Sequence, residues 1–177
     1  MKPVLQWLGL AALFALIGHF AVILATPYVL MNGAMNKLSA HGRAVNQFVY
    51  SPRTTAASRA VVRPSPDLAY AACVYDIAKG PLRVHAAPSR DYMSVSVFQA
   101  DSDNIFVVND RQAPTGVDFV LAKAGQATPT GVKVVISPSV KGIILDRRLA
   151  PTQDLFAQAD QARHGDLCQS IASAPAA

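Results

Sequence analysis

The first 31 residues of the chain are apolar almost throughout, and this run restricts the possible folds more than any other feature. It reads MKPVLQWLGLAALFALIGHFAVILATPYVLM, and Lys2 is its only charged side chain. An apolar helix of about 20 residues is long enough to cross the hydrocarbon core of a bilayer. Trp7 and Tyr28 stand near the two ends, where amphipathic rings favour the membrane interface. The sequence therefore predicts a membrane anchor at residues 1–31.

A cleavable signal peptide is the alternative, because it is also apolar and N-terminal. Its apolar region is usually about 7–15 residues long, which is shorter than this run. No clean Ala-x-Ala cleavage site follows, so we expect the anchor to be retained. Lys37 and Arg43 follow the run, and charge counting therefore does not decide the orientation. An anchor this close to the start usually exports the rest of the chain. We expect a single-pass protein of the inner (cytoplasmic) membrane with its C-terminal domain in the periplasm.

All eleven acidic residues of the chain are Asp, and this excludes several functional classes. Zinc proteases with the HExxH helix and EF-hand calcium loops both need a glutamate. Four arginines lie between the anchor and the first expected strand, namely Arg43, Arg53, Arg59 and Arg63. A basic stretch beside a membrane either remains solvated or touches anionic headgroups. No nucleic-acid-binding motif accompanies the charge, so we expect no nucleic-acid partner.

Short apolar runs separated by Gly and Pro turn signals follow the polar segment 51–58. This pattern predicts strands. The expected strands are Ala69–Ile77, Leu82–Ala86, Tyr92–Gln99, Ile105–Asn109, Val117–Ala122, Val132–Ser137 and Gly142–Leu145. Because no helices intervene, the fold class is mainly β: an N-terminal transmembrane helix followed by an antiparallel β-sandwich or partial barrel with a C-terminal helix.

Helical spacing is expected in two other places. Residues 34–49 favour a helix or broken helix, interrupted by Gly42, and Thr152 is a plausible N-cap for a helix near Asp154–Arg163. Gly165 is expected to break that helix before a second helical turn. The domains expected are an anchor at 1–31, a helical or polar connector at 32–58, a β-rich domain at 59–170 and a flexible tail at 171–177.

Motifs that would indicate a cofactor or a metal are weak in this chain. Tyr75 and Lys79 have the Tyr-x-x-x-Lys spacing of short-chain dehydrogenases, but the segment is strand-like and no glycine fingerprint accompanies it. Asp101 and Asp103 suit either a hard cation or a turn in which they bond their own backbone. The Asp146-Arg147-Arg148 run at a strand end is typical of surface pairs or turns. We expect no cofactor and no metal.

Residues 61–86 resemble the bacterial domain of unknown function 1254 family. Asp67, Tyr70, Asp76, Gly80 and Pro81 follow the order of that family's motif, and RDYMSVSVFQADSDNIFVVNDR is similar to its next signature. The resemblance covers roughly residues 60 to 165. It implies a β-rich domain and a companion of the domain of unknown function 1214 type, in the same chain or as a separate membrane protein. The family supplies no established reaction.

Two functions remain open from the sequence. The first is a membrane-anchored bacterial envelope protein whose periplasmic domain is an interaction or binding module, with the lipid bilayer and the companion protein as partners. The alternative is a hydrolase or lyase that uses Asp67, Tyr70 or Asp76 together with an Arg. Catalysis would require these groups to converge in one concave site.

Cys73 and Cys168 are the only cysteines. Export would place them in an oxidising compartment, where an even count favours pairing. The alternative is two small buried side chains that never meet, or a reduced cytoplasmic domain. We favour the bridge, which requires Cα atoms within about 7 Å of each other.

Overall fold

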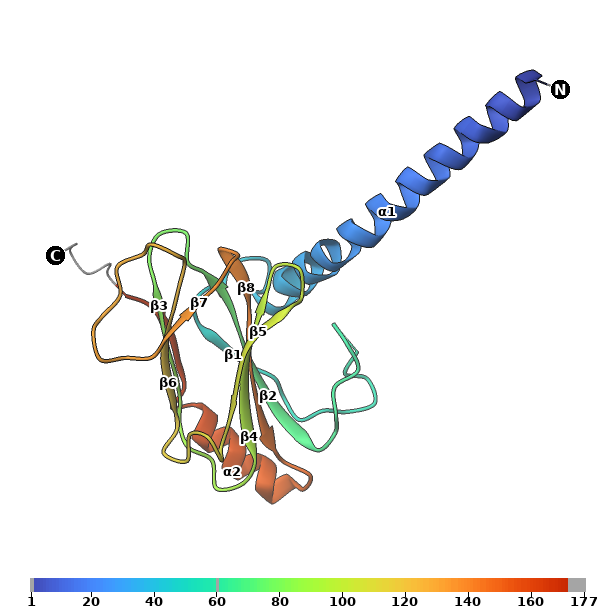
Figure 1. The fold of residues 1–177 in the computed structure, drawn as a ribbon. Coiled ribbons are helices and arrows are strands. Elements are labelled where there is room, and N and C mark those ends of the chain that lie inside the picture. The colour runs from blue at the N-terminus through green and yellow to red at the C-terminus, as the bar shows by residue number, and fades with distance from the viewer. Residues whose placement is uncertain (1, 60, 172–177) are drawn as a thin grey trace.

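The computed structural model of this chain describes residues 2–59 and 61–171, so most of the expected tail at 171–177 lies outside the described residues. The described residues form two helices and nine strands (Figure 1). Their bounds are α1 Lys2–Leu38, β1 Phe48–Tyr50, β2 Leu68–Asp76, β3 Leu82–Ala86, β4 Met93–Gln99, β5 Asn104–Asn109, β6 Val117–Ala122, β7 Val134–Ile136, β8 Lys141–Leu149, α2 Gln153–Arg163 and β9 Leu167–Ser170.

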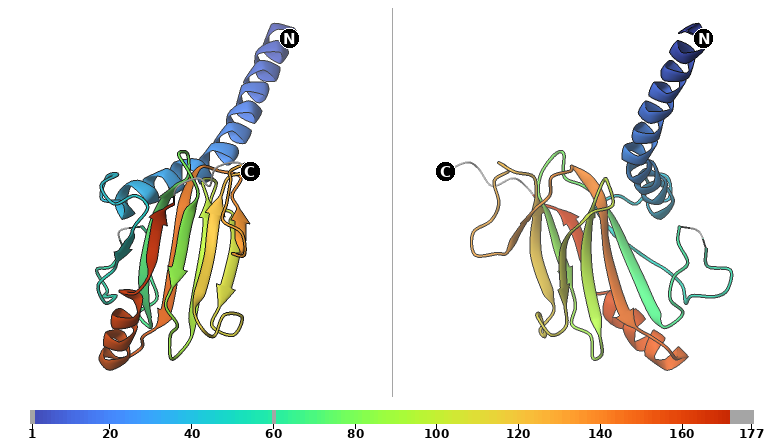
Figure 2. Two further views of the ribbon diagram at one scale, coloured as in Figure 1. Left: turned by 90° about the vertical axis from the view of Figure 1, so that its left-hand side faces the viewer. Right: turned by 45° about the vertical axis from the view of Figure 1, so that its right-hand side comes forward.

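α1 projects away from the strands over most of its length (Figures 1 and 2). The segment Pro3–Leu38 contains a window of 18 residues with a mean hydropathy of 2.4, none of it buried in the structure. By length and composition, this helix can cross a membrane. Its last part differs, because Met31 and Met35 are buried against Val74 of β2 and Ile143 of β8. The helix therefore combines an exposed apolar portion with an end that packs on the β domain.

The connector that follows α1 is less helical than expected. The helix continues past residue 31 but ends at Leu38, and Phe48–Tyr50 forms a strand. Ala40, His41 and Gly42 have φ values of 49°, 60° and 85°, which is left-handed backbone that cannot continue an α-helix. The expected helix or broken helix over 34–49 is thus confirmed only for its first residues.

The strands form two sheets that face each other without closing into a barrel (Figure 2). The first sheet has the order β1-β2-β8-β4-β5 and is antiparallel throughout. The second has the order β7-β6-β3-β9, in which only β6 and β7 are parallel. This arrangement confirms the predicted mainly β fold and its C-terminal helix.

The core lies between the two sheets and follows the alternation of side chains along each strand. In β2, Cys73 and Tyr75 point into this core, whereas Ala72 and Val74 point outwards to the end of α1. Both faces of β2 are therefore covered, which explains why this strand reads as an almost continuous apolar run. The opposite sheet contributes Leu82, Val84, Phe119 and Leu121 to the same core.

The C-terminal segment partly departs from expectation. α2 begins after Thr152, whose side chain accepts a hydrogen bond from the Leu155 backbone N–H at 3.3 Å, as the N-cap prediction requires. The second helical turn expected after Gly165 is wrong, because Leu167–Ser170 is strand β9 and pairs with β3. In this strand only Cys168 is buried, and a single buried position among four residues gives no periodic pattern that could be recognised in the sequence.

Candidate functional site

The three candidate catalytic residues are spread along β2 and its approach. Asp67 and Asp76 stand nine positions apart in extended chain, which separates them by about 30 Å. The Tyr70 hydroxyl accepts a hydrogen bond from the Ser65 backbone N–H at 2.9 Å. The Asp76 carboxylate accepts one from the Ala78 backbone N–H at 2.9 Å, and it lies 3.5 Å from the Lys141 ammonium. The structure does not bring Asp67, Tyr70 and Asp76 together, and each has a local structural role or is exposed.

The densest set of ionisable side chains lies elsewhere, between β8 and the segment after α2. We call Asp146, Arg148 and Asp166 the buried charge cluster. Arg148 Nε donates to Asp146 Oδ2 at 2.7 Å, and Arg148 Nη2 donates to Asp166 Oδ1 at 2.8 Å. All three side chains have a relative exposure of 0%. A guanidinium therefore joins two carboxyl groups in the interior of the domain.

Three segments of the chain position this cluster. Ile144, Asp146 and Arg148 alternate along β8 and face inwards, so the cluster continues the apolar inner face of that strand. Asp166 follows α2 and precedes β9. Its Oδ1 also accepts a hydrogen bond at 2.8 Å from the backbone N–H of Ala87, which follows β3. The cluster thus ties both sheets to the end of α2.

The electrostatics of the cluster favour one proton on its carboxyl groups. Burial raises the pKa of Asp166 to about 7, and the negative charge of Asp146 acts in the same direction against Arg148. Burial also raises the pKa of Asp146, although Arg148 opposes this. Asp146 Oδ1 and Asp166 Oδ2 are buried without a donor among the described residues. Because the two carboxyl groups interact with each other, a proton on one of them removes the repulsion between two buried negative charges.

A second arginine lies beside the cluster. The Arg163 guanidinium, 2% exposed, donates to the backbone carbonyl of Ser51 at 2.7 Å and to that of Tyr70. It lies 5.5 Å from the ring centre of Tyr50. Burial, and then the charge of Asp166, raise the pKa of Tyr50. Arg163 therefore holds α2 against β1 and β2.

The closed position of the cluster limits its chemistry. A cavity of about 150 Å³ lies between α2 and the connection from β3 to β4, but Asp146, Arg148 and Asp166 do not line it. The residues that line the cavity are Ser89, Arg90, Asp91, Leu149, Leu155, Gln158, Ala159 and Ala162. A substrate cannot reach the buried charge cluster in this structure, so the cluster supports a role in holding the fold together.

The structure corrects the prediction made for residues 146–148. Asp146 and Arg148 are not a surface pair at a strand end, because β8 continues to Leu149 and buries both. Only Arg147 points to the outer face, where its Nη2 donates to Ser96 Oγ at 2.9 Å. The alternation from Ile144 onwards was the available signal, but the pairing with Asp166 has no counterpart in the sequence pattern.

Asp101 and Asp103, which suited either a cation or a turn, take part in hydrogen bonds within a turn. Gln99 Nε2 donates to Asp101 Oδ2 at 3.0 Å, and the Asp103 backbone N–H donates to Asp101 Oδ1 at 3.1 Å. These bonds are those of a turn that satisfies its own backbone. Within residues 2–59 and 61–171, no three His, Cys, Asp or Glu side chains gather as metal ligands would.

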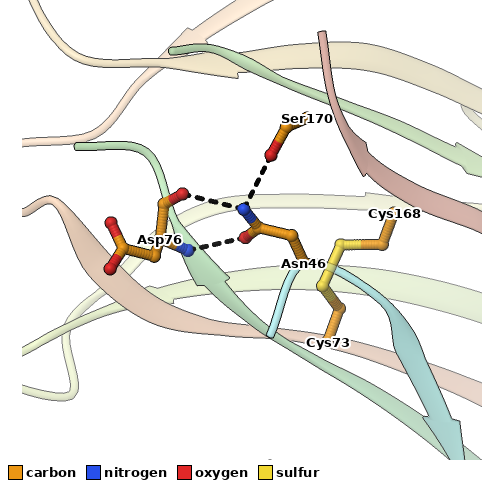
Figure 3. Close-up of a disulfide and its surroundings, with 5 residues drawn as sticks. All are labelled: Asn46, Cys73, Asp76, Cys168 and Ser170. Carbon is orange, nitrogen blue, oxygen red and sulfur yellow. Dashed lines mark hydrogen bonds between the residues drawn. A yellow bond between two sulfur atoms is a disulfide. The ribbon is translucent and has the colours of Figure 1, made fainter. Parts of the chain in front are cut away.

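A disulfide joins the two sheets. Cys73 of β2 and Cys168 of β9 are bridged, with their Cα atoms 6.5 Å apart (Figure 3). Nearby, the Asn46 side chain accepts from the Asp76 backbone N–H at 2.7 Å and donates to Ser170 Oγ at 2.8 Å. One covalent bond and one amide side chain therefore connect β2 to β9.

Comparisons with known proteins agree with this fold. No curated protein sequence matches the chain. The structure is similar to the VPA0106 protein from Vibrio parahaemolyticus, with 15% identity and a TM-score of 0.59, over 85% of this chain and 38% of that one. An uncharacterised protein from Burkholderia cenocepacia matches with 16% identity and a TM-score of 0.48, over 84% of this chain and 41% of that one. The chain thus spans about two fifths of the length of each.

The family assignment rests on the sequence match. Residues 45–169 match the model of the DUF1254 family, which is described as proteins of unknown function. The matched region includes every strand from β1 to β8 and both cysteines of the bridge. This chain belongs to the DUF1254 family.

Proposed function

We propose that this protein is anchored by α1 in the bacterial inner membrane and holds its β domain in the periplasm as an interaction module. The observation that carries this proposal is the division of α1 into two parts. Its apolar window is fully exposed, whereas Met31 and Met35 at its end are buried on the first sheet. A helix of this kind needs an apolar environment for one part and a fixed domain for the other.

The disulfide supports the periplasmic location. Structural disulfides persist in oxidising compartments such as the bacterial periplasm and are rare in the cytosol. The bridge between Cys73 and Cys168 is almost fully buried, at 0% and 5% exposure of the two residues. A domain that depends on this bridge is therefore best suited to export.

The proposed partner is a membrane protein of the domain of unknown function 1214 type, which the family resemblance implies. Two observations favour a binding role over a reaction. The three candidate catalytic residues do not converge, and the buried charge cluster is closed to substrates.

Membrane fractionation and a reporter fusion test the proposal. The full chain should resist extraction with alkaline carbonate, and its intact mass should include the anchor. A phosphatase that is active only in the periplasm, fused after Ala177, should be active, whereas a cytoplasmic reporter at the same position should not. A mature species that starts after Ala25, or cytoplasmic reporter activity, would contradict the proposal. Co-purification of the companion with the extracted protein, and its loss when the β domain is deleted, tests the partner.

A further inference from the structure

The segment between β1 and β2, described for residues 51–59 and 61–67, lies beside the C-terminal part of α1 in all views (Figures 1 and 2). Its two ends are held firmly to the domain. The Ser51 backbone N–H donates to the Tyr70 carbonyl at 3.0 Å, and the Ser51 carbonyl accepts from Arg163. The Ser65 backbone N–H donates to the Tyr70 hydroxyl at 2.9 Å. The segment therefore projects from a fixed base next to the helix that can cross a membrane.

The projecting part of this segment exposes two neighbouring valines. Val61 is 40% exposed and Val62 is 71% exposed. An apolar side chain that stays in water contributes no burial energy to the fold. Moving it from water into an apolar environment would be favourable. Two valines are a small apolar area and indicate nothing alone. Their meaning depends on the charges around them and on their position in the molecule.

The charges around the valines have one sign. Arg59 and Arg63 flank the pair and are exposed, and Arg53 lies in the same segment. Between Gln47 and Pro66 the sequence contains no acidic residue, and the one carboxylate of the segment, Asp67, stands at its end where β2 begins, so three arginines face a single acidic group. Guanidinium groups bind phosphates through paired hydrogen bonds, and basic residues near a membrane are attracted to anionic lipids.

We propose that Val61 and Val62 enter the interface of the same bilayer that α1 crosses, while Arg59 and Arg63 bind headgroup phosphates of anionic lipids. The proposal rests on α1 being the membrane anchor. It adds a second attachment, so that the β domain is held against the bilayer at two points, and α1 with the domain packed on its end cannot rotate freely in the bilayer. A lipid surface is favoured over a protein partner by the position beside α1 and by the pairing of an apolar tip with cationic flanks.

A tryptophan placed at the tip tests this contact in the full chain. Trp7 is the only native tryptophan, so a Trp7→Phe background makes Val62→Trp the only emitter. The protein is reconstituted into vesicles of phosphatidylcholine and phosphatidylglycerol, with or without bromine on the acyl chains near the headgroups. A matched control is Leu167→Trp in the same background. Leu167 is 46% exposed and is the first residue of β9, soon after the end of α2. α2 lies at the end of the domain opposite α1 (Figure 1).

The expected result is a shift of the Val62→Trp emission to shorter wavelength and its quenching by the brominated lipid. The Leu167→Trp control should emit as in water and be quenched by acrylamide instead. Adding Arg59→Gln and Arg63→Gln, or removing phosphatidylglycerol, should reduce the lipid quenching at position 62. The matched substitution Arg111→Gln, in an exposed residue of the connection between β5 and β6, should not.

Flotation of the same vesicles separates the two proposals. If the protein floats with the lipid but Val62→Trp behaves like Leu167→Trp, the loop contact is overturned and the anchor stands. Shielding of position 62 from acrylamide without lipid quenching also overturns it and indicates protein association. If the protein does not float, the anchor is overturned and the loop contact with it.

Discussion

At the scale of single residues, the main feature is three charged side chains in the core. Removing an ion from water costs several kcal/mol, and a buried pair recovers this only with good geometry and further hydrogen bonds. Arg148 meets part of this requirement by donating to both Asp146 and Asp166, but its Nη1, Asp146 Oδ1 and Asp166 Oδ2 are buried without a partner among the described residues. Two carboxyl groups against one guanidinium leave an excess negative charge, and the raised pKa of Asp166 indicates how this charge is removed.

The stability of the domain should therefore depend on pH through Asp166. Its pKa is about 7 in the fold and 3.8 as the ordinary value, so between these values the folded state holds a proton that the unfolded state has lost. The free energy of unfolding should be highest near pH 4 and decrease by up to about 4 kcal/mol as the pH rises to 7, then level off. Urea unfolding of the full chain in a mild detergent, across this pH range, measures the slope.

Asp166→Asn is the variant that isolates this effect. The amide oxygen still accepts from Arg148 and Ala87, but the side chain no longer titrates. The slope between pH 4 and 7 should then largely disappear. Asp118→Asn is the control, because Asp118 pairs with Arg83 at the surface, 2.8 Å away, with 39% of its side chain exposed. An unchanged slope in Asp166→Asn would show that other groups cause the pH dependence.

The disulfide could be predicted from the sequence, whereas the buried charge cluster could not, for a physical reason. Cys73 and Cys168 are the only two cysteines, so each can pair only with the other within the chain. Their number, together with an expected oxidising compartment, is enough to favour a disulfide. Asp146 and Asp166 are ordinary aspartates in sequence. Their burial depends on Arg148 reaching both across the fold, and this is a tertiary property with no local pattern.

At the scale of elements, the seven strands expected from alternation are present as β2 to β8, with small differences at their ends. β1 and β9 were not predicted, because each is short and depends on pairing with a distant strand. β8 continues beyond its expected end because its buried charges looked like a strand terminus. Local periodicity thus predicts strands that bury apolar side chains. It fails for strands whose formation depends on pairing with a distant strand, or whose buried side chains are charged and paired with each other.

Gly142 in β8 provides a test of close packing between elements. A Cβ at this position would overlap the backbone carbonyl oxygen of Phe98 and the hydroxyl of Tyr75. Because the carbonyl belongs to the adjacent strand β4, it cannot move without shifting the sheet. Gly142→Ala should destabilise the domain by at least about 1–3 kcal/mol, measured by urea unfolding.

Gly33 in α1 is the matched control for this substitution. It has no atom within 4 Å of the added Cβ, and alanine is the better helix former. Gly33→Ala should therefore leave the stability of the β domain unchanged or raise it slightly. Equal effects of the two substitutions would contradict the close approach at Gly142.

At the scale of the whole molecule, the first and last parts of the β domain meet at one place. The bridge from Cys73 to Cys168 spans 95 residues of sequence, and Asn46 binds both Asp76 and Ser170 beside it. The two sheets are therefore linked through β2 and β9 as well as through their shared core. This linkage should contribute to stability mainly by restricting the unfolded chain.

Removing the bridge should lower stability without changing the fold. The Cys73→Ser, Cys168→Ser double variant should lose up to about 4–5 kcal/mol of unfolding free energy in the chain-entropy model. Guanidinium unfolding of the native protein with and without reductant should show the same loss. Alkylation of the denatured native protein without reductant should find no free thiol. Two free thiols would mean that the bridge does not form in the cell.

The position of β9 also has a consequence for how the protein is made. β9 supplies the outer strand beside β3 and the second cysteine of the bridge, 95 residues after the first. Because a ribosome makes the chain from its N-terminus, Cys73 has no native partner until residue 168 has been added, and the second sheet stays incomplete for as long. A chain truncated before residue 168 would keep a free Cys73 thiol, and a thiol-specific alkylating reagent distinguishes it from the bridged fold.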